Sequence, residues 1–566
     1  MRVLYCLVLL ALSCGGNKQV LLSTPRPKPQ QSKVEESITL SLVGTNDFHG
    51  SMHMLPWLGG YLNNLRAEER PVLLLDAGDM FQGTLESNLG EGDVVVQAYN
   101  ALNYDAVAIG NHEFDFGPVG SDTTVKQPTQ NPRGALLQRA SEAHFPFLSA
   151  NILLKTSNER PDWKNVYPHV LIEKAGIKIG IIGATTEGTP WETIATNVAD
   201  LKFSSIASAI EEQAAILKGR GADFIVVTVH EGGACDEFHD PKNVESCETD
   251  APIMEVARKL NSNLVQAIVA GHTHRGMAHV VNGIAIIESF AQGVAFGRID
   301  FTLRKTDKRI LGRKIYPPQQ LCKAIEKNEC MPFDYAGKSV SKDISVEKIV
   351  SASQERAAKK KNESLGVYIK GVFFRSRSDP SPLSNLFADY MLKAHPEADA
   401  ALINNGAIRS NLNEGTLTYG QLYEAHPFDN SFVMVTLTAK QLKTVIKKQL
   451  EQQGSFISFA GITIKAFCRN KELQLSLTSK SGKTIKDTAS IHLVTSNFVA
   501  NGGGAFLSSL DLPADSFHDF EGQDIRESIA QLLKKQGGTL DAADPKLFDP
   551  KHPRIEFEGK RPLICH

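Results

Sequence analysis

Five short motifs rich in Asp, His and Asn have the residue types that bind metal ions and support hydrolysis. They occupy residues 46–50 (NDFHG), 76–79 (DAGD), 110–115 (GNHEFD), 230–231 (HE) and 271–274 (GHTH). Carboxylate oxygens and imidazole nitrogens suit divalent ions such as Zn, Mn, Co or Fe, and one carboxylate can bridge two ions. A lone exposed histidine is usually only a solvated side chain, but five such motifs in series predict a dinuclear metal site.

Two of the motifs contain a pair of ligand-type residues separated by one position. The pairs are Asp47 with His49 and His272 with His274. In an extended backbone, residues i and i+2 point to the same side, so we expect each pair to bind one metal centre. The glycines that flank the motifs permit the sharp turns from strand into loop that such a site needs.

Continuous apolar runs along the first half of the chain predict the strands that position these motifs. The runs are residues 39–43, 72–75, 106–109, 179–182, 224–229 and 267–269. Continuous apolar character is typical of strands that are covered on both faces in an α/β protein. Because ligands gather beyond the carboxyl ends of such strands, we expect the motifs to converge in space.

The length and composition of the chain indicate a globular protein of two domains. The chain has 566 residues, which is long for one hydrophobic core, and 42% of them are hydrophobic and 22% charged. A net charge of −2 gives no general attraction for a nucleic-acid polymer or an anionic membrane. Any binding of an anionic substrate must therefore depend on local charges. The composition does not indicate an oligomeric state.

A charged, Ala-rich stretch at residues 346–363 separates the two units and is predicted to be a solvated linker helix. We expect a first domain at residues 37–320, a linker at 321–365 and a mixed α/β domain at 366–566. Within the last, Thr438 followed by Gln441 predicts a capping box that begins a helix. This helix should run to about residue 453 and stop at Gly454.

The first 36 residues are predicted to direct export. A short apolar run followed by small residues predicts a signal peptide at residues 1–14, and a Pro-, Gln- and Lys-rich stretch predicts an extended tether at 15–36. Cys14 stands where bacterial lipoproteins are acylated. We expect an exported bacterial lipoprotein of the periplasm or cell envelope, in contact with the membrane only through this anchor. The alternative is plain cleavage without a lipid.

The cysteines are consistent with an exported protein. Of eight, six remain when the signal peptide is removed and Cys14 carries a lipid, and six can pair completely. The pairs closest in sequence, and therefore the expected local disulfides, are Cys235 with Cys247 and Cys322 with Cys330.

The ordered series of motifs, above all GNHEFD and GHTH, resembles the calcineurin-like metallophosphoesterases. More narrowly it is similar to the two-domain 5'-nucleotidases, which include bacterial UDP-sugar hydrolase and animal ecto-5'-nucleotidase. The resemblance implies an α/β fold with an N-terminal four-layer β-sandwich flanked by helices and a smaller mixed α/β C-terminal domain. It implies two divalent metal ions, such as Zn or Mn, as cofactors.

Carried over position by position, the resemblance implies the ligands of both ions. The first ion is held by Asp47, His49, Asp79 and His274, and Asp79 bridges to a second ion held by Asn111, His230 and His272. Two neighbouring cations acidify a bridging water to hydroxide at neutral pH and neutralise the phosphoryl oxygens during its in-line attack.

The GNHEFD motif matches the family's catalytic residues, which implies roles for Asn111, His112 and Asp115. His112 would stabilise the transition state by donating to the developing negative charge. Asp115 would orient His112 and favour its imidazolium form. The alternative for Asp115 is a carboxylate that only caps a loop.

Three motifs of the second unit extend the resemblance, at residues 404–409 (NNGAIR), 426–432 (HPFDNSF) and 497–504 (NFVANGGG). They imply a pocket that holds a nucleotide by its phosphate and its base.

Arg409 and Asn404 are the implied polar contacts, and Phe428 and Phe498 are the implied stacking platform for the base. The alternative is that both phenylalanines belong to the core. Either Arg375 or Arg377 would supply a second phosphate-binding arginine.

Gly504 departs from the family pattern. The nucleotidases have an Asp at this place that accepts hydrogen bonds from the ribose hydroxyls, whereas this chain has Gly504. Because a hydrogen bond to a substrate hydroxyl discriminates strongly, we expect weaker recognition of the sugar. The metal ligands are unaffected by this change.

The expected activity is hydrolysis of 5'-nucleotides, extending to nucleotide sugars, with the two domains closing over the substrate. Two rivals share the fold: a 2',3'-cyclic phosphodiesterase with 3'-nucleotidase activity, and a thiosulfate-releasing hydrolase that acts on a carrier protein. A third alternative is a surface binding protein without turnover. Such a protein would be expected to lack some metal ligands, whereas here every ligand position is filled by a competent residue.

Overall fold

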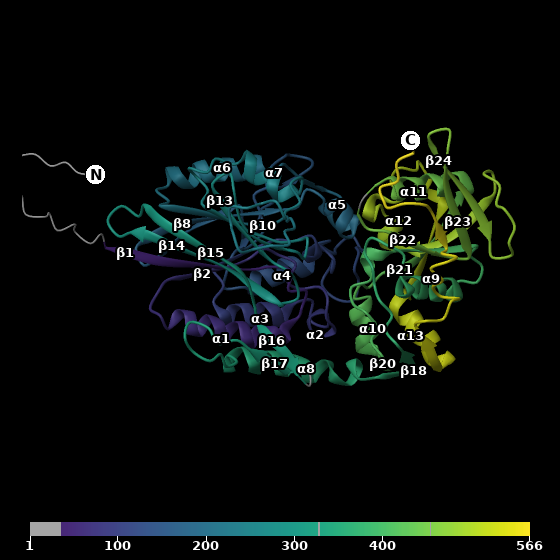
Figure 1. Cartoon of the computed structure of the whole chain (residues 1–566), viewed down its shortest axis with the longest axis horizontal. Coiled ribbons are helices and arrows are strands. Elements are labelled where there is room, and N and C mark those ends of the chain that lie inside the picture. The colour runs from purple at the N-terminus through teal and green to yellow at the C-terminus, as the bar shows by residue number, and fades with distance from the viewer. Residues whose placement is uncertain (1–35, 327–328, 453, 566) are drawn as a thin grey trace, which may run out of the picture.

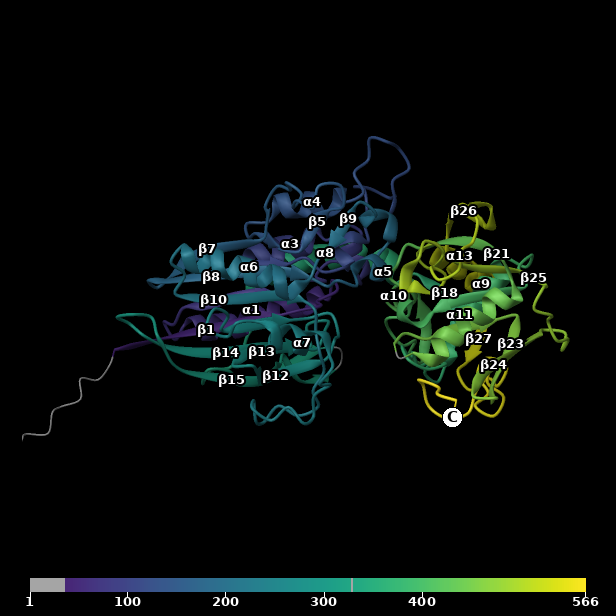
Figure 2. The same ribbon diagram turned by 90° about the horizontal axis from the view of Figure 1, so that it is seen from above.

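The computed structural model describes residues 36–326, 329–452 and 454–565. The predicted signal peptide, Cys14 and all but the last residue of the predicted tether lie outside this part of the chain. Figure 1 shows two lobes, one from the purple and teal part of the chain and one from the green and yellow part, and Figure 2 shows the same division from above. The predicted domain boundaries remain predictions.

Two large β-sheets form the N-terminal lobe. The seven-stranded sheet, in the order β15-β14-β1-β2-β3-β4-β6, consists of β1 (Ser37–Thr45), β2 (Val72–Asp76), β3 (Ala106–Ala108), β4 (Phe147–Leu148), β6 (Val166–Tyr167), β14 (Ala295–Arg304) and β15 (Ile310–Gln320). The six-stranded sheet, in the order β12-β13-β11-β10-β8-β7, consists of β7 (His169–Lys174), β8 (Ile177–Thr185), β10 (Phe224–His230), β11 (Ala267–Ala270), β12 (Gly276–Val281) and β13 (Ile284–Ser289). All six predicted apolar runs form strands, although β3 ends one residue earlier than predicted.

Helices cover the outer faces of both sheets. The seven-stranded sheet packs against α1 (Leu55–Arg66), α3 (Asp93–Leu102) and α4 (Gly134–Glu142). The six-stranded sheet packs against α6 (Ile206–Gly219) and α7 (Pro252–Lys259). The lobe therefore has four layers, which confirms the predicted sandwich.

The layers explain why the strand sequences are apolar without alternation. In β10, Phe224 and Val226 pack between the two sheets, whereas Ile225 and Val227 pack under the outer helices. Both faces of the strand are dry, so both sets of side chains must be apolar.

Shorter elements connect these layers. They are η1 (Met52–Met54), α2 (Leu85–Asn88), η2 (His112–Phe114), β5 (Ile152–Leu154), α5 (Thr189–Glu192), η3 (Ala195–Val198), β9 (Leu201–Phe203), β16 (Cys322–Glu326) and β17 (Glu329–Pro332).

Helix α8 (Ile344–Lys361) runs from one lobe to the other at the lower edge of Figure 1. Most of its charged residues are exposed as predicted, but Lys361 is half-buried and ion-paired with Glu86, and the helix is not solvated all round. Val346, Val350, Ser353 and Ala357 are buried. Their spacing of three and four residues places them on one helix face, which packs against α1, α2 and α3.

The C-terminal lobe is a mixed α/β unit built on a five-stranded sheet. This sheet, in the order β22-β19-β25-β21-β26, consists of β19 (Ala400–Asn404), β21 (Ser431–Thr438), β22 (Ile457–Ala460), β25 (Ser490–Ser496) and β26 (Phe517–Asp524). Two three-stranded sheets add β18 (Ser364–Lys370), β20 (Gly415–Thr418) and β27 (Gly538–Asp541), and β23 (Ile462–Arg469), β24 (Glu472–Ser479) and β28 (Ile555–Glu556).

The helical elements of this lobe are α9 (Pro382–Ala394), η4 (Asn405–Ala407), α10 (Tyr419–Ala425), α11 (Ala439–Glu451), α12 (Asn497–Ala500), η5 (Gly503–Ala505), η6 (Ala514–Ser516) and α13 (Ile525–Gln536). The predicted capping box begins α11: Thr438 Oγ1 accepts from the Gln441 backbone N–H, and Gln441 Oε1 accepts from that of Thr438.

Three disulfides are present in the described residues. Cys235–Cys247 and Cys322–Cys330 confirm the two predicted local pairs, and Cys468–Cys565 joins β23 to the C-terminal segment.

Candidate metal centre

The five N-terminal motifs converge beyond the carboxyl ends of β1, β2, β3, β10 and β11. Six of their side chains form two compact groups, in each of which the ligand atoms lie within 4.8 Å of one another. The first group is Asp47, His49 and His274, and the second is Asp79, His230 and His272.

Asp79 belongs to the second group and also lies next to the first. Its Oδ2 is 3.1 Å from His230 Nε2 and 3.8 Å from His49 Nε2. Within the first group, His49 Nε2 is 3.0 Å from His274 Nε2, which is in turn 3.3 Å from Asp47 Oδ1. A carboxylate in this central position has the geometry of a ligand shared by two ions.

Asn111 completes the second group. Its Oδ1 lies 2.9 Å from His230 Nε2, and His272 Nδ1 lies 3.2 Å from the same nitrogen. All seven residues that the sequence predicts as metal ligands are thus brought together.

Backbone carbonyls orient two of the imidazole rings. His49 Nδ1 is 2.8 Å from the carbonyl oxygen of Gln82, and His230 Nδ1 is 2.8 Å from that of Ala77. Since a carbonyl can only accept, Nδ1 carries the proton and Nε2 turns its lone pair toward the site.

The backbone at the ligands differs from the predicted extended form. Five ligand residues have left-handed φ values: Asp47 (51°), His49 (48°), Asp79 (57°), His272 (78°) and His274 (59°). The extended-backbone argument for the paired ligands is therefore wrong. Asp47 and His49 do lie in one ligand group, but His272 and His274 lie in different groups, so the expectation that each pair binds one centre fails for the second pair. Such conformations are unfavourable for residues with a Cβ, and they persist where the surrounding structure holds them.

Glycines make room for this loop geometry. Gly78 has a φ of +93°, and a Cβ at Gly110 would lie 2.2 Å from Asp79 Oδ1. A side chain at Gly110 would therefore displace the central carboxylate.

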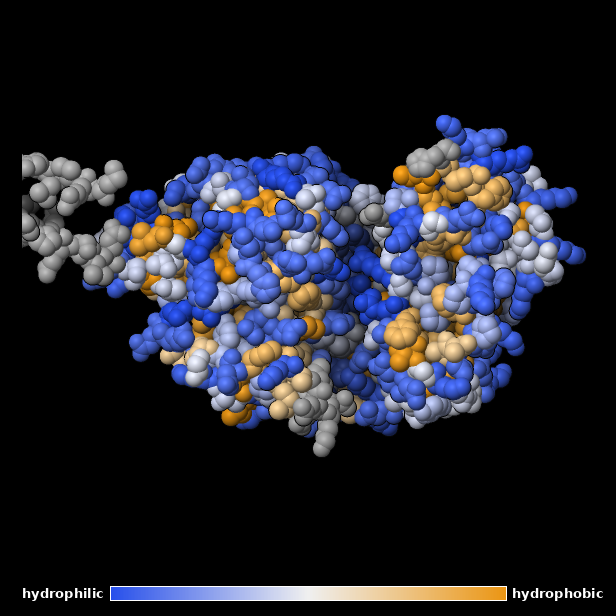
Figure 3. Space-filling view, in the orientation of Figure 1, coloured by the Kyte–Doolittle hydropathy of each residue, from blue (hydrophilic) through white to orange (hydrophobic). Residues whose placement is uncertain are grey.

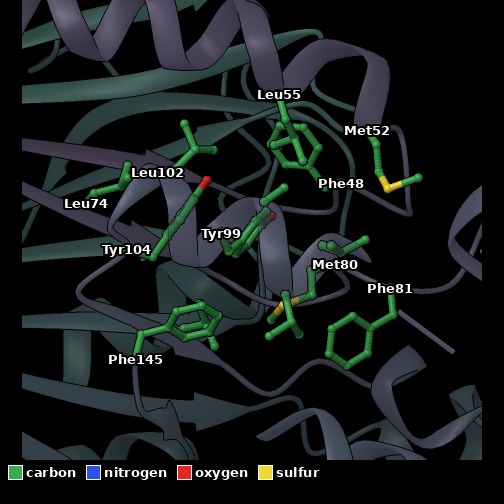
Figure 4. Close-up of a cluster of buried hydrophobic side chains, with 14 of the residues drawn as sticks. Phe48, Met52, Leu55, Leu74, Met80, Phe81, Tyr99, Leu102, Tyr104 and Phe145 are labelled. Carbon is green, nitrogen blue, oxygen red and sulfur yellow. The ribbon is translucent and has the colours of Figure 1, made fainter. Parts of the chain in front are cut away.

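Apolar neighbours anchor the ligand loops in the core. Figure 4 shows Phe48, Met80 and Phe81 packed in one cluster with Tyr99 and Tyr104. Phe48 separates two ligands and is 1% exposed, while Met80 and Phe81 directly follow Asp79 and are fully buried. Phe48, Met80 and Phe81 are buried in the core. Because they are neighbours of Asp47, His49 and Asp79 in the chain, their packing holds these ligands at the surface of the core that faces the metal centre.

Glu113 is a structural residue that the sequence did not single out. Its carboxylate is buried and accepts hydrogen bonds from the backbone N–H groups of Asp79, Met80 and Gly110, at 2.7–2.9 Å. It ties the DAGD and GNHEFD loops together. Its position within the GNHEFD motif is the sequence feature that could have identified Glu113 as important.

The residues fit divalent metal ions. Asp47 is fully buried; its Oδ2 accepts from Asn46 Nδ2 and the His272 backbone, whereas Oδ1 accepts no hydrogen bond within the described part of the chain. Burial raises the pKa of Asp47, but His274 and His230 outweigh this and lower it below its usual range. A buried, ionised oxygen without a donor is suited to a cation, and the mixed N and O donors suit Zn or Mn.

His112 lies at the edge of the metal centre in a chain of contacts. Its Nδ1 is 2.5 Å from Asp115 Oδ2, and its Nε2 is 2.7 Å from Arg409 Nη2 of the other lobe. Thr193 Oγ1 donates to Asp115 Oδ1 at 2.7 Å. Asp115 therefore contacts the imidazole, as the resemblance implies.

A cavity of about 430 Å³ opens between the lobes beside the metal centre. It lies where Figure 3 shows the surface hollowed between the two lobes. Among the predicted substrate residues, those that line it are Asn404, Arg409, Phe428, Phe498 and Arg377. Arg375 is not among its described lining residues, so the geometry favours Arg377 as the second arginine.

Arg409 is held in a cationic, apolar setting. Its guanidinium carbon lies 5.4 Å from the centre of the Phe428 ring, which is 5.6 Å from the His112 ring. Burial and the neighbouring Arg377 lower the pKa of Arg409 to about 10. An anion bound here would relieve the repulsion between the two arginines.

The loop at Gly504 cannot accommodate a larger residue in its present form. Gly504 has a φ of +65°, and a Cβ there would lie 2.0 Å from the Phe506 ring. Phe506 is 2% exposed and lines the cavity. The segment therefore presents an apolar ring where the resemblance implies a carboxylate.

Glu192 is a second residue that the sequence did not single out. It lines the cavity, and its Oε2 lies 3.2 Å from His272 Nε2. No spacing rule connects it to the ligand motifs, because it lies in a short helix that follows β8.

Two family models match the chain, one in each lobe. Calcineurin-like phosphoesterase matches residues 40–276, and 5'-nucleotidase, C-terminal domain, matches residues 361–509. The chain belongs to the calcineurin-like phosphoesterases that carry a 5'-nucleotidase C-terminal domain, and it is a phosphoric ester hydrolase of that type. Members of this class use divalent metal ions.

Individual relatives are distant but cover most of the chain. Endonuclease YhcR of Bacillus subtilis is 27% identical over 85% of this chain, which spans only 37% of that relative's length. Protein UshA of Yersinia enterocolitica is 25% identical over 85% of this chain and 88% of its own. The crystal structure of a 5'-nucleotidase precursor from Thermus thermophilus has the same fold, with a TM-score of 0.69 at 22% identity over 90% of this chain and 100% of its own.

Within the described part of the chain, we find no helix with the length and apolar character required to cross a membrane.

Proposed function

We propose that this protein releases phosphate from 5'-nucleotides at a dinuclear metal site in the cavity between its lobes. The observation that carries the proposal is that both ligand groups and the predicted nucleotide contacts meet at one cavity. Pockets of this kind, with convergent polar groups and charged residues, are the usual sites of catalysis.

Each ligand group would hold one of the two ions. Asp47, His49 and His274 would hold one ion, His230, His272 and Asn111 would hold the other, and Asp79 would contact both. Two divalent ions, when bound, acidify a water molecule and neutralise charge on phosphoryl oxygens. No residue of the chain then has to act as a covalent nucleophile.

His112 and Arg409 would stabilise the phosphoryl group from the edge of the metal centre, where the His112 backbone N–H donates to Asp79 Oδ1 at 2.9 Å. Arg409 Nη2 donates to His112 Nε2 at 2.7 Å, so the two groups meet at one point of the cavity lining. A phosphate oxygen that replaced this direct contact would accept from the guanidinium and from an N–H at His112 Nε2. Asp115 holds His112 in the required orientation through Nδ1.

The C-terminal lobe would select the rest of the substrate. Phe428 and Phe498 line the cavity and would stack on a base without reading its identity. Gly504 offers no acceptor to the ribose hydroxyls. We therefore expect broad tolerance of the base and weak discrimination of the sugar.

The lobes would close over the substrate and open to release the product. In the present arrangement Gln82 Nε2 donates to the Pro427 carbonyl at 2.9 Å, and Arg409 reaches His112, so the lobes are in contact. A disulfide engineered across the cavity should slow turnover if this motion is required.

Hydrolysis of nucleotide sugars, or of 2',3'-cyclic and 3'-nucleotides, would use the same centre. The thiosulfate-releasing alternative is disfavoured by the two phenylalanines at the cavity, and a binding role without turnover is disfavoured by the complete set of ligands. We place the protein outside the cytoplasm, in the periplasm or cell envelope, with Cys14 as its lipid anchor. The disulfides support export.

A substrate panel tests the proposal. Purified protein supplied with Mn²⁺ or Zn²⁺ would be given AMP, UMP, UDP-glucose, 3'-AMP, 2',3'-cyclic AMP and an aryl phosphate. The proposal predicts fastest phosphate release from AMP and UMP at similar rates. Release from the aryl phosphate alone would keep the metal chemistry and refute the nucleotide assignment.

A further inference from the structure

A short segment after β8 comprises Trp191, Glu192 and Thr193. It lies where the second ligand group, the His112–Asp115 pair and the C-terminal lobe meet. It contains the end of α5, which Figures 1 and 2 both place at the face between the lobes. Helix α5 also contacts η5 of the C-terminal lobe, and residues of both elements line the cavity. Trp191 lines the cavity and is 49% exposed.

Glu192 contacts two residues of the second ligand group with different atoms. Its backbone carbonyl accepts from Asn111 Nδ2 at 2.9 Å, which turns Asn111 Oδ1 toward His230. Its carboxylate Oε2 lies 3.2 Å from His272 Nε2, so His272 presents Nδ1 to the group. A carboxylate behind a ligand imidazole fixes the ring and increases its basicity.

Thr193 contacts the pair formed by His112 and Asp115. The residue is 1% exposed, and its hydroxyl donates to Asp115 Oδ1, while Asp115 Oδ2 contacts His112 Nδ1. Adjacent residues of one segment thus hold two candidate metal ligands and the His112–Asp115 pair.

We propose that Glu192 and Thr193 are positioning residues, Glu192 for the second metal ion and Thr193 for His112, in a segment that also meets the C-terminal lobe. This inference rests on the proposed dinuclear site. It assigns separable roles: Glu192 sets the affinity of the second ion, and Thr193 sets the rate of the chemical step.

Cobalt titration of metal-free protein tests the first role without reference to turnover. Co²⁺ absorption would be followed for the wild type, Glu192→Ala, Glu192→Gln and the control Glu212→Ala, an exposed residue of α6. We expect two equivalents in the wild type. Glu192→Ala should weaken the second equivalent roughly 10- to 100-fold and leave the first unchanged, because support behind a ligand has effects of this size.

Glu192→Gln should restore part of the lost affinity, since its amide oxygen can still accept from His272. Equal weakening of both equivalents, or no change in either, would overturn the role of Glu192. If the wild type binds cobalt twice but releases no phosphate from any nucleotide, the proposed function fails while the role of Glu192 stands; the kcat of Thr193→Val would then be measured with the aryl phosphate.

Thr193→Val tests the second role. It should lower kcat about 2- to 10-fold, the effect of losing one hydrogen bond, while KM and both cobalt affinities stay at the wild-type values. Thr193→Ser, which keeps the hydroxyl, should recover kcat. A change in the second cobalt affinity, or an unchanged kcat, would overturn the assignment.

Discussion

The metal face and the substrate face of the cavity are built in different ways. Asp47, Asp79 and His230 have side chains that are at most 2% exposed, and backbone carbonyls, backbone N–H groups and core aromatics hold the ligand loops. Across the cavity, Arg377 is exposed and Phe428 and Phe498 are only partly buried. The chemistry therefore depends on a rigid core, whereas substrate choice depends on contacts that can change singly, as at Gly504.

Removal of the central carboxylate would disturb the metal face most. Asp79→Ala should lower kcat by roughly three orders of magnitude or more, because bound metal contributes several kcal/mol of transition-state stabilisation. Phosphate release and metal content would be measured together, with Asp162→Ala, an exposed residue, as control. If Asp79→Ala kept full turnover with fewer than two metal ions per chain, the proposal that two ions are required would be contradicted.

His112 should affect rate without affecting metal content. His112→Ala is expected to lower kcat about 10²- to 10³-fold, the usual effect of removing one donor to a developing charge. Metal analysis of the variant should still find two ions. A variant that loses its metals would place His112 among the ligands instead.

On the substrate face, Phe498 should matter only for substrates with a base. Phe498→Ala should lower kcat/KM for AMP about 5- to 150-fold, since stacking contributes roughly 1–3 kcal/mol, and leave glycerol phosphate unchanged. Phe374→Ala, at a ring 60% exposed outside the cavity lining, is the matched control. Equal losses for both substrates would assign Phe498 to the core.

The last prediction concerns the stability of the loop at Gly504. Gly504→Asp should lower the free energy of unfolding by about 1–3 kcal/mol, because the new Cβ overlaps the Phe506 ring. Adding Phe506→Ala should recover part of the loss and strengthen binding of ribonucleotides relative to 2'-deoxynucleotides. Denaturant unfolding and inhibition constants measure both effects. A single variant as stable as the wild type would show that the loop adapts freely.

Local patterns carried most of what could be predicted from the sequence. The apolar runs predicted the six central strands because both faces of each strand are buried, and the motifs after them supplied every residue of the two ligand groups. The Thr438 capping box was readable for the same reason: its contacts span three residues.

Long-range packing limited the prediction elsewhere. Asp47 and His274 have left-handed backbone conformations that depend on the surrounding loops. The spacing of two residues within each ligand pair carries no information about those loops, so it suggested an extended backbone. Glu192 meets His272 across 80 residues of sequence, and no local rule relates them. The choice between Arg375 and Arg377 also depended on which side chain reaches the cavity.

Anomalous diffraction from crystals grown with Mn²⁺ and a non-hydrolysable AMP analogue would test the central claim most directly. The account predicts two manganese peaks, one beside Asp47, His49 and His274 and one beside Asp79, His230 and His272, with the base between Phe428 and Phe498. A single peak, or an analogue bound away from the cavity between the lobes, would contradict it.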